Sequence, residues 1–441
     1  MLQHIRSLKP LVAVGALSSP LEVGAQEAPR AGQALARLLK KSGCSTVQLG
    51  ALHNPGDAVA AGRLCAENHV DAIALVASSW YEDYLVTDML EECATPLLVW
   101  ALPGMENGAL CGNQQLTCYL KQLAHPCAAV FGPLEDPACQ EKGAVFLRAA
   151  ALKGRLRRAR IGLAGHRLNG MTLAAASDFL LKKVVGPRVV PLDLPQLLER
   201  AGQVRRQEAA RAWAKLKRRA GACRVSDEAG LDAMRAHLAV REEVARHGLH
   251  ALTIGCYPHL MGRFCLAASL LADEGVPLAC EGDVHGAVGQ YMLQQLTGRP
   301  THCTDWLNPL EDGSVVFTHC GSGSLTLAED ASQVLLAPVR LMDRGACALF
   351  TARPGPVTLL SITARTDGYQ CALLEGEALP TEMVFPGNPL RVRFDTPTAR
   401  IIEWIHDEGI GHHWMAGYGH VGAEVSAWAR MAGPDLRLLI P

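Results

Sequence analysis

Residues 275–324 have the sequence GVPLACEGDVHGAVGQYMLQQLTGRPTHCTDWLNPLEDGSVVFTHCGSGS, and the order of elements in this stretch decides the fold class. The apolar run Val276–Cys280 predicts a buried strand. The pattern of residues 285–296, closed by a glycine and a proline, predicts a helix. A second apolar run, Val315–Thr318, predicts another strand. A strand, a helix and a strand in this order indicate an α/β protein.

Polar side chains follow both predicted strands. Glu281-Gly-Asp283 comes directly after the first run and His319 directly after the second, while Asp305 lies between them. Open α/β sheets bind ligands just beyond the carboxyl ends of their strands. Acidic side chains with a histidine favour a hard divalent ion such as Mn²⁺ or Mg²⁺ over a zinc ion held by thiolates. A further ligand must come from elsewhere, and residues 409–420 near the C-terminus offer histidines.

The same residues also have ordinary structural interpretations. Glu281 and Asp283 precede a predicted helix, and acidic residues are favoured at helix N-termini, so Asp283 can simply cap that helix. Asp305, taken alone, is an ordinary acidic residue of a loop. His319 can be a metal ligand, a substrate contact or a residue that packs at the end of a strand.

The composition excludes several classes of protein. The chain has 441 residues, a formal net charge of −1 and 49% hydrophobic residues, which argues against disorder and against a polyelectrolyte partner such as a nucleic acid. No apolar run approaches the roughly 20 residues of a membrane span. Fifteen cysteines are scattered without CxxC pairs. We therefore expect reduced thiols in a cytoplasmic protein, with no membrane association.

The first part of the chain, residues 1–154, predicts an α/β domain with a parallel sheet. Short apolar runs alternate with helical patterns in the manner of βαβ units. The first strand-to-helix turn, Gly15-Ala-Leu-Ser-Ser, lacks the GxGxxG pattern, so we expect no nucleotide cofactor. The strands are expected near residues 11–15, 47–49, 72–76 and 97–101.

Two further domains are expected. Residues 155–304 predict a second α/β domain of the same Rossmann-like kind, which begins with the strand Arg160–Leu163 and carries Glu281. Beyond residue 305 short strand-like runs alternate with turn residues, and this pattern predicts an antiparallel sheet or small barrel. Residues 305–441 therefore form a C-terminal β-rich domain that carries Asp305 and, in a loop, His413.

Glu281-Gly-Asp283, followed by Asp305, resembles the metal-binding core of L-fucose isomerase and its relatives. The tail segment 417–423, GYGHVGA, is similar to the C-terminal signature of that enzyme, whose ligand histidine stands five residues before the tyrosine. That position is His413 here. L-arabinose isomerase is similar in layout and adds a ligand histidine that corresponds to His319.

The resemblance implies an aldose–ketose isomerase that uses Mn²⁺ or another divalent ion. Glu281, Asp305 and His413 would hold the ion, with His319 as a possible fourth ligand. The pair that corresponds to Glu281 and Asp305 would move protons through a cis-enediol. The implied substrate is an open-chain sugar such as L-fucose or D-arabinose.

The resemblance also implies shared sites in a homo-oligomer, a trimer or a hexamer. Residues 78–89, SSWYEDYLVTDM, resemble a segment of fucose isomerase whose tryptophan, here Trp80, reaches the site of a neighbouring subunit. His412 and Trp414, which flank His413, complete the expected substrate contacts. The chain is much shorter than fucose isomerase and lacks an arginine that the longer enzyme brings to its sugar near Ser18. A sugar-binding or regulatory protein on the same scaffold, without turnover, is the alternative.

Overall fold

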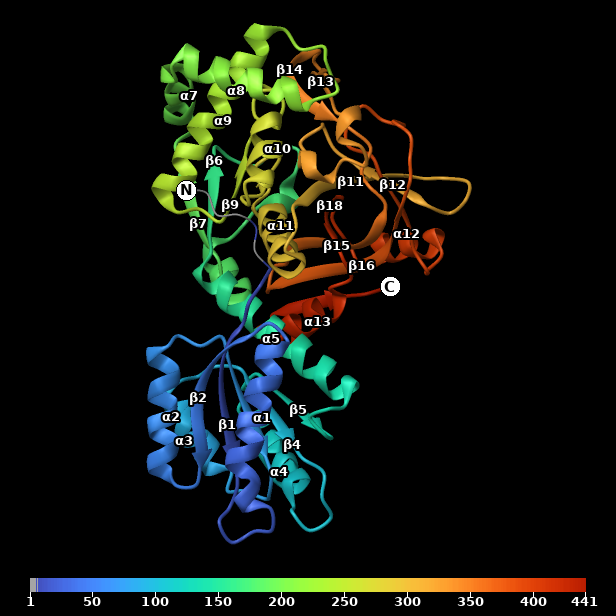
Figure 1. Cartoon of the computed structure of the whole chain (residues 1–441). Coiled ribbons are helices and arrows are strands. Elements are labelled where there is room, and N and C mark those ends of the chain that lie inside the picture. Colours follow the sequence, from blue (N-terminus) through green and yellow to red (C-terminus); the bar gives the residue numbers. More distant parts are fainter. Residues whose placement is uncertain (1–4, 6) are drawn as a thin grey trace. The chain divides into compact units, whose positions relative to one another are not determined.

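The structure is a computed structural model, and it describes residue 5 and residues 7–441 of the chain (Figure 1). The chain divides into two compact units. The smaller unit contains residues 8–155 and 423–433, and the larger contains residues 156–422 and 434–441. Among the described residues, none of the helices combines the length and the apolar composition that crossing a membrane requires.

The smaller unit is built on a five-stranded parallel sheet with strand order β2-β1-β3-β4-β5 (Figure 1). Its third strand is buried along its whole length, as its run of apolar residues requires. The strands are β1 Leu11–Leu17, β2 Ser45–Leu52, β3 Ala72–Ala77, β4 Leu97–Ala101 and β5 Cys127–Phe131. The helices are α1 Ala28–Lys41, α2 Pro55–Glu67, α3 Tyr84–Glu92, α4 Ala109–Gln122, α5 Pro137–Arg158 and α13 Gly422–Ala432.

The larger unit begins with a four-stranded parallel sheet of order β10-β9-β6-β7. The strands are β6 Arg160–Ala164, β7 Arg188–Leu192, β9 Ala251–Ile254 and β10 Leu278–Ala279. The helices are α6 Asp178–Leu180, α7 Leu194–Gln203, α8 Arg206–Arg219, α9 Asp227–His247, α10 Cys265–Asp273 and α11 Val284–Thr297. The predicted strand Val276–Cys280 is present in shortened form, and the predicted helix after it is α11.

A closed barrel follows. Antiparallel strands pair in the order β15-β18-β11-β12-β17-β16, and β16 pairs with β15 to complete the ring. Closure leaves none of these six strands as an open edge. The strands are β11 Thr301–Pro309, β12 Val315–Thr318, β15 Gly355–Ala364, β16 Tyr369–Leu379, β17 Leu390–Arg393 and β18 His413–Tyr418; β19 Leu436–Leu439 pairs with β16, and α12 spans Thr398–Asp407. A small sheet contains β8 Ala222–Cys223, β13 Leu335–Val339 and β14 Arg344–Leu349.

The predicted fold class, parallel α/β sheets followed by a β-rich part, is confirmed. Two local predictions near the site are wrong. Asp305 was expected in a loop, but it lies within β11, and His413 is the first residue of β18 rather than a loop residue. Short polar residues such as those of THCTD obscure the strand pattern, because their burial comes from the surrounding layers and not from their own hydrophobicity.

Candidate metal centre

The register of the barrel brings two of the predicted ligands together. Asp305 of β11 lies directly opposite His413 of β18. On its other side Asp305 lies opposite Thr318, the last residue of β12, so His319 follows immediately beyond that strand. Residues that are directly opposite on antiparallel strands have Cβ atoms about 5 Å apart. Three polar side chains are therefore gathered at one place by backbone pairing alone.

Glu281 reaches the same place from the parallel sheet, in a strained turn. Its φ is +66° and that of Gly282 is +73°, so two successive residues are in the left-handed region. Such a conformation costs a non-glycine residue on the order of 1–3 kcal/mol and is concentrated at functional sites. The turn is held by hydrogen bonds from Gly282 N to Ile254 O (3.1 Å) and from Leu168 N to Glu281 O (3.0 Å). A Cβ at position 282 would lie 2.4 Å from the carbonyl oxygen of His166, so only glycine fits there.

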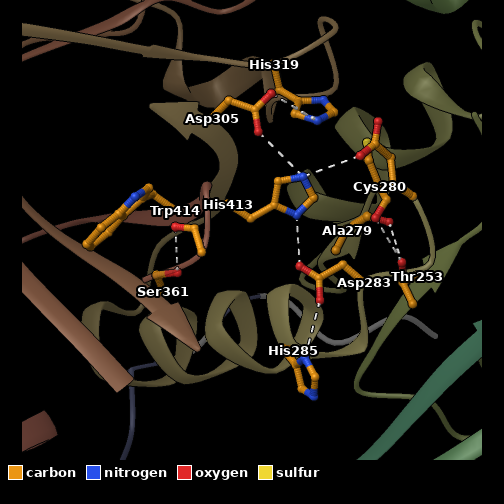
Figure 2. A network of polar contacts seen from close by, with 12 residues as sticks. Thr253, Ala279, Cys280, Asp283, His285, Asp305, His319, Ser361, His413 and Trp414 are labelled. Carbon is orange, nitrogen blue, oxygen red and sulfur yellow. Dashed lines mark hydrogen bonds and ion pairs between the residues drawn. The ribbon is translucent and has the colours of Figure 1, made fainter. Parts of the chain in front are cut away.

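His413 is at the centre of the cluster (Figure 2). Its Nε2 lies 3.5 Å from Oε2 of Glu281 and 3.5 Å from Oδ1 of Asp305. His319 adds a second imidazole, with its Nε2 3.8 Å from Oδ2 of Asp305. Both histidines are buried, and both carboxylates are partly buried. Two overlapping sets, Glu281 with His319 and His413, and Asp305 with His412 and His413, have potential ligand atoms within 4.8 Å of one another.

The atoms that face one another fit a divalent cation. Oδ1 of Asp305 and Nε2 of His413, which lie 3.5 Å apart, are buried and have no hydrogen-bond partner. Leaving such groups unpaired is expensive, so each requires an explanation. Neighbouring ligand atoms about 2.1 Å from one octahedral ion lie about 3 Å apart, close to the separations found here. Carboxylate oxygens with imidazole nitrogens suit Mn²⁺ and related ions.

The electrostatics of the cluster also favour a cation. Burial alone would lower the pKa of His413, but hydrogen bonding to Asp283 and the contact with Glu281 raise it to about 9. Burial would raise the pKa of Glu281, yet the neighbouring histidines His413 and His319 outweigh burial and lower it. The surrounding carboxylates therefore stabilise a positive charge at this point. A metal ion would compete with the proton of His413 for the same ring nitrogen.

The expected substrate contacts have different positions. The ring of His412 is exposed and its centroid is 4.5 Å from that of His413. Trp414 points to the other face of β18, where its fully buried ring lies against Trp306, so the structure does not bring it to the cluster. Trp80 belongs to the smaller unit, where its indole N–H donates to Oε1 of Gln115 (3.1 Å). Its role in a neighbouring site stays a prediction.

For Asp283, the structure shows a different contact from the helix cap that the sequence suggested. Asp283 stands at the N-cap position of α11, yet its side chain makes no capping hydrogen bond. Instead its Oδ2 accepts a hydrogen bond from Nδ1 of His413 at 2.9 Å. The sequence did contain a signal for this role, namely a second carboxylate two positions after Glu281. Helix capping accounted for it equally well, because the sequence alone does not show that β18 lies beside this turn.

Curated relatives with a described activity exist, although no family model matches the chain. A protein of Alkalicoccus urumqiensis named sulfoquinovose isomerase is 25% identical over 375 residues, which are 82% of this chain and 84% of the relative. Another with this name, from Clostridium sp. (strain MSTE9), is 28% identical over 354 residues, 76% of this chain and 79% of the relative. A third, from Priestia megaterium, is 23% identical over 385 residues, 85% and 86% of the two chains.

The chain is a homologue of sugar isomerases. These relatives confirm the prediction of an enzyme of the aldose–ketose isomerase class. They support a member of the sugar isomerases in general and do not single out L-fucose or L-arabinose isomerase. The similarity extends over about four fifths of the chain.

We expect Glu281→Gln to keep the fold and to lose activity. The two side chains have nearly the same shape, but the amide is neither a charged ligand nor a base. Sugar isomerisation should fall by about 10²–10⁴-fold or more, the range for loss of a general acid–base group. The rate would be measured with metal in excess, and circular dichroism would verify the fold. Activity close to that of the unaltered protein would remove Glu281 from the site.

A second pair of variants separates the adjacent histidines. His413→Ala removes the nitrogen that faces both carboxylates, and we expect Mn²⁺ affinity to fall by more than about 100-fold. His412→Ala should reduce it by at most the roughly 10–100-fold typical of groups outside the ligand set. Titration of the two metal-free proteins with Mn²⁺ gives both values. The reverse order would show that His412, not His413, is the ligand.

Proposed function

We propose that the protein is a divalent-metal-dependent aldose–ketose isomerase of an open-chain sugar, with sulfoquinovose as the first candidate substrate. The observation that carries the proposal is the unpartnered Nε2 of buried His413, which faces the carboxylates of Glu281 and Asp305 at 3.5 Å each. The names of the relatives support sulfoquinovose ahead of L-fucose and D-arabinose. A binding protein without turnover is the less favoured alternative, because these relatives are enzymes.

Glu281, Asp305 and His413 would hold the ion, with His319 as a further ligand. When bound, Mn²⁺ or a similar ion supplies Lewis-acid chemistry that polarises the sugar carbonyl and acidifies the adjacent hydroxyl. His319 and His413 are both buried, and Glu281 and Asp305 are partly buried. The low exposure strengthens every electrostatic interaction between the side chains and a bound sugar.

The two carboxylates would carry the proton transfer. The hydrogen on C2 of the aldose leaves as a proton to one carboxylate, and a proton is delivered to C1. The hydroxyl proton of O2 moves to O1, so that the carbonyl group shifts from C1 to C2. The neighbouring histidines lower the pKa of Glu281, which favours the ionised form, the form that can accept a proton.

One arginine has its backbone beside the cluster, and its side chain is a candidate contact for the sulfonate of sulfoquinovose. Arg167 is in the loop after β6, and its backbone packs against Gly282, next to Glu281. Its guanidinium donates to the carbonyl groups of Leu168 (3.1 Å) and Asn169 (3.4 Å) in its own loop. Within the described part of the chain no salt bridge joins Arg167 to a carboxylate. Arginine binds oxyanions through its fork of N–H donors, so we infer that Arg167 binds the anionic group.

The proposal includes assembly and location. We expect a cytoplasmic homo-oligomer, a trimer or hexamer, in which Trp80 reaches the site of a neighbouring subunit. The resemblance to L-fucose isomerase is the basis for this part, together with cysteines that are scattered without CxxC motifs.

The experiment that tests the proposal is a comparison of sugars and metals. Metal-free protein, with and without added Mn²⁺, would be incubated in D₂O with sulfoquinovose, L-fucose and D-arabinose. Quinovose, which lacks only the sulfonate, is the matched control. We expect metal-dependent ketose formation from sulfoquinovose, with deuterium entering at the carbon that receives the proton. Turnover without metal would contradict the metal site, and turnover of the neutral sugars alone would contradict the substrate assignment.

The role of Arg167 has a separate test. Arg167→Gln should raise the KM for sulfoquinovose by about tenfold or more, since a charge-assisted contact is lost. The KM for quinovose should stay unchanged, because that sugar has no anion. Arg218→Gln, an exposed substitution on α8, controls for the change in net charge. An equal rise of KM for both sugars would exclude a specific contact with the sulfonate.

A further inference from the structure

Asp283 is a buried carboxylate that the proposed reaction does not use. The residue is 4% exposed, and its side chain lies at the start of α11, on the side of His413 opposite to Asp305 (Figure 2). Oδ2 is 2.9 Å from Nδ1 of His413. Neither of the two potential ligand sets includes Asp283. Burial of a carboxylate costs several kcal/mol unless it is well paired, so a role for this one is expected.

The hydrogen bond fixes which nitrogen of His413 can bind a metal ion. An ionised carboxylate only accepts hydrogen bonds, so Nδ1 must carry the hydrogen. In a neutral imidazole the other nitrogen, Nε2, then has a free lone pair. Nε2 is the atom that faces Glu281 and Asp305. The bond therefore selects both the tautomer and the orientation of the ring.

Among the described residues, the backbone of Gly286 also contributes a hydrogen bond to Asp283, but His285 is the other ionisable side chain beside it. Oδ1 of Asp283 lies 3.9 Å from Nδ1 of His285, beyond hydrogen-bond distance, and both atoms are without a partner. The other nitrogen of His285 is 3.3 Å from the hydroxyl of Tyr369. Burial lowers the pKa of His285, which disfavours a charged imidazole that would compete with His413 for Asp283. His413 is thus the side chain that is hydrogen-bonded to the carboxylate.

We propose that Asp283 is a positioning residue, which holds His413 with Nε2 directed at the metal ion and makes that nitrogen a stronger ligand. Carboxylate–histidine–metal arrangements work in this way, and loss of the carboxylate typically weakens metal binding about 10–100-fold. The inference rests on the proposed metal site. It assigns to Asp283 a function that acts through another residue and does not require contact with the sugar.

The test is the variant Asp283→Asn, which is nearly isosteric. The asparagine amide can donate to Nδ1, and it then favours the tautomer whose Nε2 carries the hydrogen and cannot bind metal. Titration of metal-free protein with Mn²⁺, followed by the electron paramagnetic resonance of the free ion, should give a Kd raised about 10–100-fold. The KM for the sugar at saturating Mn²⁺ should remain that of the unaltered protein. An unchanged Kd would overturn the proposal.

Tyr369→Phe is the matched control in the same pocket. It removes the hydroxyl beside His285 and leaves the bond between Asp283 and His413 in place. Its Mn²⁺ affinity should equal that of the unaltered protein. If Tyr369→Phe lost as much Mn²⁺ affinity as Asp283→Asn, any disturbance of the pocket would weaken metal binding. This outcome would overturn a specific role for Asp283.

A measurement on the unaltered protein decides the matter if Asp283→Asn fails to fold. Nitrogen-15 NMR of histidine-labelled protein, loaded with diamagnetic Mg²⁺, reports which ring nitrogen of His413 carries hydrogen. The signal is assigned by its disappearance in His413→Gln. Hydrogen on Nδ1 supports the proposal, and hydrogen on Nε2 overturns it. Should the unaltered protein bind neither Mn²⁺ nor Mg²⁺, the proposed metal site fails, and the positioning role fails with it.

Discussion

The candidate site depends on the pairing of β11 with β18. Asp305 and His413 are opposite one another in this antiparallel pair, and the next pairing, with β12, brings His319 alongside. Because side chains alternate along a strand, a shift of one residue would replace Asp305 by Thr304 or Trp306 at the site. The closed barrel prevents such a shift, since each of its six strands is held by two neighbours. Trp414, next to His413, fills the barrel interior and so resists rotation of β18.

The parallel sheet contributes one residue under strain. Glu281 has a left-handed backbone just beyond β10, and Gly282 continues the turn where the 166–168 segment leaves no room for a side chain. The arrangement matches the general placement of ligands beyond the carboxyl ends of parallel strands. The carboxylates of Glu281, from a strained turn, and of Asp305, from the barrel, thus both face Nε2 of His413.

Much of this arrangement was predictable from the sequence, and some was not. The parallel sheets follow from apolar runs such as Ala72–Ala77, whose burial on both faces makes the pattern strong. Glu281, Asp305 and His413 were identified through the resemblance to L-fucose isomerase. Strand β11 was missed because the polar residues at its start, which become buried by a tertiary environment, carry no hydrophobic period. The short strand β18 follows a glycine-rich segment and was expected to begin as a loop. The partnership of Asp283 with His413 joins residues 130 positions apart, and local sequence does not contain it.

The origin of the ligands has a consequence for the stability of the protein. Glu281 extends from the parallel sheet, whereas Asp305 and His413 are barrel residues, so an ion between them ties two layers of the larger unit together. A ligand that binds only the folded chain raises the free energy of unfolding by about 2.7 kcal/mol when its free concentration is 100 times its Kd. The unfolded chain, in which these ligands are far apart, has no comparable affinity. The concentration of free metal ion would then affect the stability of the folded protein as well as its catalytic rate.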